Sequence, residues 1–245
     1  MTIKDILDYI DSRAPFATAE EWDNPGLLVG SGAQAVSRVL VALDATNGAL
    51  EAAQAIGADL MITHHPVIFA PLRRLAADDL PYRLAAAGIG LIAAHTNLDK
   101  AAGGVNDTLA ERLGLTDVTV AADGMTRIGN LPAAENPTAF ARRVAAALDT
   151  PVRVGGNRTV RTVAVCGGSG GDFIPDLVGQ VDAFVTGEVK HHQWLEATDS
   201  LTLVEAGHYA TEAPVVDTLC SWLQETFPTL SVTPYFDGQP YTIVK

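Results

Sequence analysis

Cysteine is nearly absent from this chain of 245 residues, which contains only Cys166 and Cys220. Two cysteines are too few for a disulfide framework or for a metal cluster held by thiolates. A metal site in this protein would therefore use histidine and carboxylate ligands. Cys166 is the last residue of a strand-like segment, and we interpret it as a small buried filler.

Basic residues are also few, with 16 Lys and Arg against 29 Asp and Glu, which gives a formal net charge of −13 and a pI near 4.7. Binding to duplex nucleic acid depends on clustered basic contacts with phosphates. The acidic balance therefore argues against a nucleic-acid partner, although it leaves room for a local basic pocket.

Long apolar runs are missing as well. No run reaches transmembrane length, and the N-terminus lacks the apolar segment of a signal peptide. We therefore expect a soluble, cytoplasmic protein with no membrane partner. With 48% apolar residues, the chain can still bury a large core, as one large domain or as two of ordinary size.

The most informative segment is 59–69, with the sequence DLMITHHPVIF. Its apolar run is typical of a strand buried on both faces, and Pro66 favours an end to the strand just after His64 and His65. Neighbouring side chains on a continuing strand point to opposite faces, so the two histidines can serve one site only where the strand ends. A metal site is one interpretation, and one hydrogen-bonded core histidine beside an exposed one is the other.

Strand-like and helix-like segments alternate along the chain, which predicts an α/β fold with largely parallel strands. A turn cluster with a tryptophan, at 20–26, is interpreted as loop packing. Predicted strands cover residues 38–43, 60–62, 89–94, 161–166, 182–186, 201–206 and 241–244, and predicted helices cover 47–56, 107–113, 137–148 and 213–226.

The two halves of the chain match strand by strand. The sequence ADLMIT at 58–63 corresponds to VDAFVT at 181–186. The next strand of each half ends in a histidine with a carboxylate four residues later, and these pairs are His95 with Asp99 and His208 with Glu212.

This internal repeat predicts two related α/β domains, residues 1–122 and 123–245, with a C-terminal segment that can pack back on the first. Open α/β sheets place their ligands at the carboxyl ends of their strands. Six side chains at such ends could hold metal: His64, His65, His95, Asp99, His208 and Glu212.

These ligand types suit zinc, iron, manganese or cobalt and do not choose among them. Any single histidine here could instead be a hydrogen-bonded core residue. Several strand ends that all carry ligand-type groups are harder to explain in that way.

A glycine loop follows the strand at 161–166 directly and could present backbone amides to a substrate phosphate. The loop matches neither the P-loop nor the dinucleotide fingerprint, and a tight strand-to-helix connection explains it equally well. Its residues are Gly167, Gly168, Ser169, Gly170 and Gly171.

A second polar cluster follows the strand at 182–186. Glu188, at the strand end, is the best acid or base candidate. His191 and His192 are interpreted as the solvated start of a helix.

The motifs ITHHPVIF, AHTNLD, VAVCGGSGG, FVTGEVKHH and GHYATE occur in this order along essentially the whole chain. With them, the chain resembles the Nif-three-like family, also called GTP cyclohydrolase type-2-like or dinuclear metal-centre hexameric proteins. The resemblance implies two related α/β domains, a site for two divalent metal ions between them, and a homohexamer arranged as a trimer of dimers. The metal ligands that it implies are His64, His65, Asp99, His208 and Glu212, with His95 orienting them or hydrogen-bonding to them.

The resemblance and the ligand set favour a metal-dependent hydrolase that acts on a nucleotide such as GTP or on another phosphorylated or cyclic amide substrate. In that scheme Glu188 would shuttle the proton. The alternative is a non-enzymatic ring that binds metal or a partner. A catalytic metal site keeps an open position, and five protein ligands for two metals leave positions open, which favours the enzyme.

Overall fold

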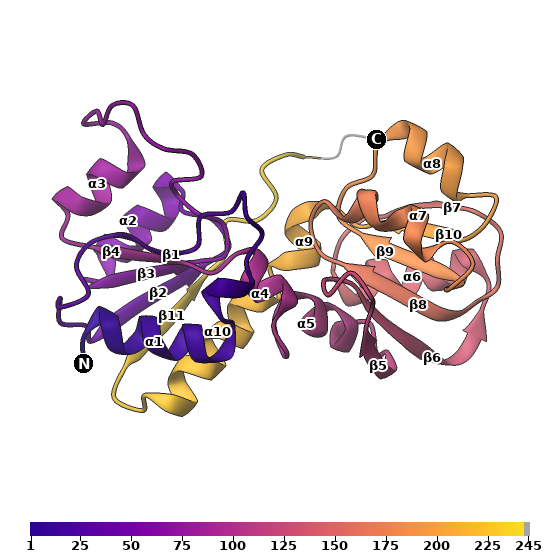
Figure 1. Cartoon of the computed structure of the whole chain (residues 1–245), viewed down its shortest axis with the longest axis horizontal. Coiled ribbons are helices and arrows are strands. Elements are labelled where there is room, and N and C mark those ends of the chain that lie inside the picture. Colours follow the sequence, from indigo (N-terminus) through magenta and orange to yellow (C-terminus); the bar gives the residue numbers. More distant parts are fainter. Residues whose placement is uncertain (243–245) are drawn as a thin grey trace. The chain divides into compact units, whose positions relative to one another are not determined.

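The computed structural model describes residues 1–242, and these form two compact units (Figure 1). Unit 1 comprises Met1–Gly104 and the segment that begins at Val215, and unit 2 comprises Val105–Pro214. None of the helices in the described part of the chain is long and apolar enough to cross a membrane. The predicted strand over 241–244 lies partly outside the described residues, and Tyr241 and Thr242 are not in a strand.

Unit 1 is built on a five-stranded sheet in which β2, β3, β4 and β11 run parallel and β1 is antiparallel to β4. From one edge to the other, its strands are β1 (Gly26–Val29), β4 (Gly90–Ala93), β3 (Leu60–Thr63), β2 (Arg38–Ala42) and β11 (Ser231–Tyr235). Its helices are α1 (Ile3–Arg13), η1 (Phe16–Thr18), α2 (Asn47–Ala55), α3 (Leu80–Ala86), α4 (Thr96–Lys100) and α10 (Val215–Thr226).

Helices cover both faces of this sheet. Figure 1 shows α2 and α3 on one face and α1 and α10 on the other. All four residues of β3 are buried, as expected for a central parallel strand. Thr2 and Asp5 form a capping box that starts α1, and the Thr46 side chain caps α2. Buried parallel strands therefore end at one edge, where the histidines follow.

Unit 2 contains a six-stranded sheet in which β8, β9 and β10 are parallel and the other pairings are antiparallel. In spatial order its strands are β5 (Thr116–Val120), β6 (Arg127–Glu135), β8 (Val160–Cys166), β9 (Ala183–Thr186), β10 (Thr202–Glu205) and β7 (Arg153–Gly155). Its helices are α5 (Val105–Arg112), α6 (Pro137–Ala147), η2 (Gly170–Phe173), α7 (Ile174–Leu177), α8 (His191–Ala197) and α9 (His208–Glu212).

The sheet of unit 2 also separates two apolar clusters. Val163, Val165 and Val185 pack with residues of α5 and α6, whereas Ala164 and Phe184 pack with residues of α7 and α8. This alternation follows from the period of two along a strand, which sends neighbouring side chains to opposite faces.

The mixed α/β architecture confirms the predicted fold class at this level. Each unit has three neighbouring parallel strands in chain order, β2–β3–β4 and β8–β9–β10, and the internal repeat remains a prediction. The grouping differs from a boundary after residue 122. Helix α5 packs on β6 and β8, and β5 pairs with β6, so both elements belong to unit 2 although they precede residue 122. Strand β11 pairs with β2 and belongs to unit 1 although it lies near the C-terminus.

Replacing Phe184 by Ala should destabilise unit 2, because this side chain of β9 is fully buried among α7 and α8 residues. The expected loss in the free energy of unfolding is about 3–5 kcal/mol, measured by urea denaturation. Val154→Ala on the edge strand β7, where the side chain is 42% exposed, should change it by less than about 0.5 kcal/mol. Equal effects of the two substitutions would contradict this description of the core.

Candidate metal centre

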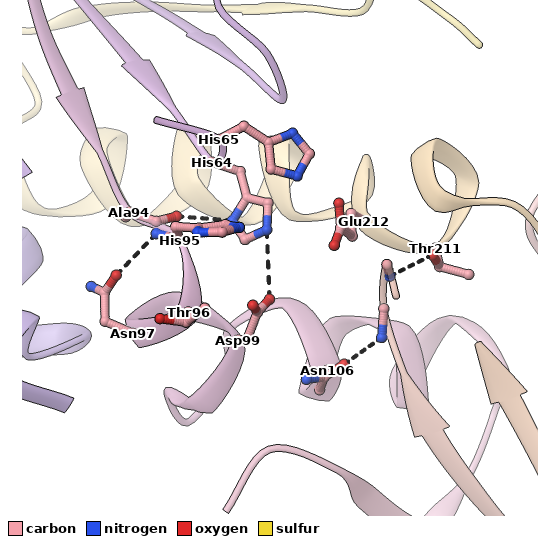
Figure 2. A network of polar contacts seen from close by, with 12 residues as sticks. His64, His65, Ala94, His95, Thr96, Asn97, Asp99, Asn106, Thr211 and Glu212 are labelled. Carbon is pink, nitrogen blue, oxygen red and sulfur yellow. Dashed lines mark hydrogen bonds and ion pairs between the residues drawn. The ribbon is translucent and has the colours of Figure 1, made fainter. Parts of the chain in front are cut away.

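His64 follows β3 directly and is fully buried. Its Nδ1 lies 2.9 Å from the carbonyl oxygen of Ala94, the residue after β4 (Figure 2). A carbonyl oxygen only accepts hydrogen bonds, so Nδ1 carries the hydrogen and the neutral ring keeps its lone pair on Nε2. That Nε2 lies 3.6 Å from Oδ1 of Asp99 on α4. The side chain therefore presents a ligand atom beside a carboxylate.

His65 is held in the same way by a carboxylate. Its Nδ1 lies 2.7 Å from Oδ1 of Asp44, which stands just beyond the end of β2. The backbone amides of His64 and His65 both donate to the carbonyl oxygen of Leu43, at 3.1 and 3.0 Å. Two strand ends thus fix the His65 ring, and a carboxylate behind an imidazole raises the basicity of the opposite nitrogen.

His95 follows β4, and its Nδ1 lies 2.8 Å from Oδ1 of Asp23. The Asp23 side chain is fully buried and also accepts hydrogen bonds from the backbone amide and the hydroxyl of Thr96, at 3.0 and 2.5 Å. Burial by itself would raise the pKa of Asp23, but the hydrogen bonds from His95 and Thr96 outweigh it and hold the pKa well below its usual range. Asp23 is therefore ionised when it holds His95.

The three imidazoles of unit 1 converge. One ring nitrogen of each lies within 4.8 Å of one ring nitrogen of the others, and Figure 2 shows the three rings gathered beside Asp99. In every case Nδ1 has an oxygen partner behind it, which directs Nε2 forward. This donor set fits a divalent metal that accepts nitrogen and oxygen ligands.

Unit 2 contains a second histidine–carboxylate cluster, at the start of α9. Nδ1 of His208 lies 3.0 Å from Oε1 of Glu188, and its Nε2 lies 3.0 Å from Oε2 of Glu212, one helical turn later. Gly207, with φ of +83°, supplies the turn before His208 that an L side chain rarely adopts. In this cluster the His208 imidazole therefore lies between two carboxylates.

Glu188 stands two residues after β9 and accepts hydrogen bonds with both oxygens. Ser169 Oγ donates to Oε2 at 2.5 Å, and this hydrogen bond lowers the pKa of Glu188; burial opposes the shift, and His208 adds to it. A side chain at Gly187 would bring its Cβ to 2.6 Å from the carbonyl oxygen of Gly168 and 2.8 Å from Cα of His208. Glycine there lets the strand end approach the glycine loop and α9 closely.

The glycine loop is packed tightly within unit 2. The amide of Gly167 donates to the Asn106 side chain at 2.7 Å, that of Gly168 to the Thr211 hydroxyl at 3.0 Å, and that of Gly170 to the Thr186 hydroxyl at 3.0 Å. These hydrogen bonds favour the strand-to-helix connection over phosphate binding as the role of this loop. The first two of these acceptors are labelled in Figure 2.

Sequence reasoning missed two side chains that hold the histidines of unit 1, Asp23 and Asp44. Asp44 had a signal, since it is a polar residue at a strand end like the histidines. Asp23 had none, because it lies in the turn cluster interpreted as loop packing. His191 and His192 are exposed at the first positions of α8, as the sequence analysis predicts for the start of a helix.

The sequence profile of one protein family, described as Duf34/NIF3 (NGG1p interacting factor 3), matches residues 1–236. A relative from Streptomyces coelicolor, named GTP cyclohydrolase 1 type 2 homolog, is 36% identical over 233 residues that cover 86% of this chain and 82% of the relative. A relative of the same name from Lactococcus lactis is 33% identical over 227 residues, covering 87% of this chain and 88% of the relative.

Two solved structures share the fold. Staphylococcus aureus protein SA1388 superposes with a TM-score of 0.92 at 28% identity, covering 100% of this chain and 99% of that protein. A Bacillus cereus protein related to NIF3 superposes with a TM-score of 0.94 at 24% identity, again covering 100% and 99%. These matches confirm the family resemblance seen in the motifs. The chain belongs to the Duf34/NIF3 (NGG1p interacting factor 3) family.

Proposed function

We propose that this protein is a metal-dependent hydrolase with a dinuclear centre whose ligands are His64, His65, Asp99, His208 and Glu212. One observation carries the proposal. Nδ1 of each of these three histidines has an oxygen acceptor behind it, which is the arrangement that metal-ligating imidazoles adopt. Zinc, iron, manganese and cobalt all suit such ligands.

The proposal requires ligands from both units, as the family resemblance implies. Unit 1 would contribute two imidazoles and Asp99, and unit 2 would contribute His208 and Glu212. When bound, divalent metals would supply Lewis-acid chemistry that activates water and polarises the oxygen under attack. Five protein ligands for two metals leave positions for a substrate, which supports an enzyme over a closed structural site.

The other polar residues would then have two roles: they orient the histidines, and one of them transfers a proton. Asp44 and Asp23 hold His65 and His95, and Glu188 holds His208. Glu188 has an exposed side chain beside His208, and a carboxylate in that position can accept a proton from an attacking water. We therefore propose two roles for Glu188, orientation of His208 and proton transfer.

A nucleotide is the proposed substrate class. Relatives that are 36% and 33% identical are named GTP cyclohydrolase 1 type 2 homolog, and this name supports a hydrolytic reaction on a purine nucleotide. A phosphorylated compound or a cyclic amide would meet the same chemistry. Because the glycine-loop amides donate within unit 2, the proposal assigns no phosphate contact to them.

Metal analysis of the protein, purified without chelator, should find about two equivalents of divalent metal per chain. His64→Ala and Glu212→Ala should each lower that content, whereas His192→Ala, which removes an exposed histidine on α8, should leave it unchanged. Retention should also fall below about pH 6, because an imidazole must be neutral to bind metal and protonation competes with it. Unchanged content in both ligand variants would refute the ligand assignment.

Two substitutions of Glu188 should separate its two roles. Glu188→Gln keeps an oxygen that accepts from His208 but cannot take a proton, so metal content should stay at the wild-type level while turnover falls about 100-fold or more. Glu188→Ala also removes the acceptor, so metal affinity should drop about 10- to 100-fold.

Turnover is measured in a hydrolysis screen of nucleotides, phosphoesters and cyclic amides with fully metallated protein. Asp99→Ala is the control, since it should lose metal and turnover together. No turnover of any compound would leave the non-enzymatic ring as the better description, and turnover that survives Asp99→Ala would point to a contaminant.

We also propose a homohexamer, most simply a trimer of dimers, as the family resemblance implies. Light scattering at micromolar concentration should then give a mass near six times 25.7 kDa. The formal charge of −13 per chain predicts that the assembly depends on ionic strength, because salt screens the repulsion between subunits. A monodisperse monomer at both low and high ionic strength would exclude the hexamer.

A further inference from the structure

Two large aromatic side chains stand exposed beside the histidines of unit 1. Trp22 is 59% exposed and Phe69 is 53% exposed, and their ring centroids are 5.7 Å apart. Both contact His95 edge to face, with centroid distances of 6.1 Å for Trp22 and 6.3 Å for Phe69. His95 in turn lies 5.1 Å from the His64 ring. A continuous series of ring contacts thus leads from the surface to the metal-binding imidazoles.

The segment that carries Trp22 is held firmly in place. The next residue, Asp23, accepts the hydrogen bonds from His95 and Thr96 described above. Asn24 donates from its side chain to the carbonyl oxygen of Ile68 at 2.6 Å, which ties this segment to the residue before Phe69. The indole is therefore exposed on a fixed backbone beside a second exposed ring, and adjacent exposed apolar side chains, unlike single ones, can mark a binding surface.

The geometry of the pair defines how a ligand could use it. A ring inserted between Trp22 and Phe69 would need about 7–8 Å between them, twice an ordinary carbon–carbon contact. The centroids are 5.7 Å apart with the planes tilted by 39°, so the pair leaves no slot. The exposed surfaces of the two neighbouring side chains, Trp22 and Phe69, instead form a platform on which a flat group can lie.

We propose that the Trp22–Phe69 platform stacks a planar heteroaromatic ring, such as a purine base, of the molecule whose reacting group is bound at the histidines. This inference rests on the proposed function for the reacting group. It adds a recognition site, formed by residues that are neither metal ligands nor their orienting partners.

A heteroaromatic ring suits this surface better than an aliphatic group does. Indole and phenyl faces stack on the flat faces of bases, and such stacking is tolerant of base identity because every base presents a π-face. His95 closes the inner edge of the platform, with Nδ1 bound to Asp23. The His95 ring lies 5.1 Å from the His64 ring and 5.4 Å from the His65 ring, so groups attached to a ring on Trp22 can reach both imidazoles past His95.

The test compares GMP with ribose 5-phosphate, which has the sugar and phosphate but no base, by titration calorimetry on the metallated protein. Trp22→Ala should weaken GMP binding about tenfold, and Trp22→Phe, which keeps an aromatic face, by less than about threefold. Leu195→Ala, which removes an apolar side chain that is 66% exposed on α8, is the matched control and should change nothing. Affinity for ribose 5-phosphate should be the same in all four proteins. GMP should also quench the fluorescence of wild-type Trp22, the exposed one of the three tryptophans.

Equal GMP affinity in the wild type and Trp22→Ala would overturn the inference, as would failure of the wild type to bind either GMP or AMP at millimolar concentration. A lower assembly mass of Trp22→Ala in light scattering would also overturn it, because the platform would then be a subunit contact. Metal content separates this inference from the proposed function. If the wild type holds metal and hydrolyses a substrate while Trp22→Ala leaves the GMP affinity unchanged, only the platform fails. If Trp22→Ala weakens GMP binding but the wild type holds no metal, only the hydrolase proposal fails.

Discussion

The hydrogen bond behind each imidazole is the interaction on which the geometry of the histidine cluster in unit 1 depends. Without it, a neutral histidine divides its proton between two nitrogens and rotates about its side-chain bonds. The Ala94 carbonyl oxygen and the carboxylates of Asp44 and Asp23 remove both freedoms in unit 1. Because these acceptors come from the ends of neighbouring strands or from a loop tied to them, the sheet sets the direction in which each ring points.

Much of this arrangement can be predicted from the sequence, because it depends on local patterns. An apolar run that stops at two histidines and a proline marks a buried strand end, and the alternation of strands and helices marks the α/β class. The structure bears out both features. Asp44 could have been added by the same rule, since it stands just beyond β2.

Other parts depend on contacts between distant residues and have no local signal. Asp23 reaches His95 across 72 positions, from a loop whose sequence has neither helical nor strand periodicity. The glycine loop is ambiguous for a related reason. A glycine in a sequence indicates that something approaches the backbone closely, but it does not show whether a ligand or the protein itself does so. Here it is the protein, since a Cβ at Gly171 would come within 2.4 Å of the Gln193 side chain. The division into units likewise follows from which strands pair, as β11 shows by pairing with β2.

The pairing of β11 with β2 also has a consequence for how the chain is synthesised. Unit 2 is one continuous stretch, whereas unit 1 is interrupted by it and receives its fifth strand from the far end of the sequence. On the ribosome, the whole of unit 2 therefore emerges while the edge of β2 still lacks its neighbour. An unpaired strand edge is a template for pairing with other chains. The order of translation thus leaves unit 1 open to nascent-chain aggregation or to chaperones until Ser231–Tyr235 has left the exit tunnel.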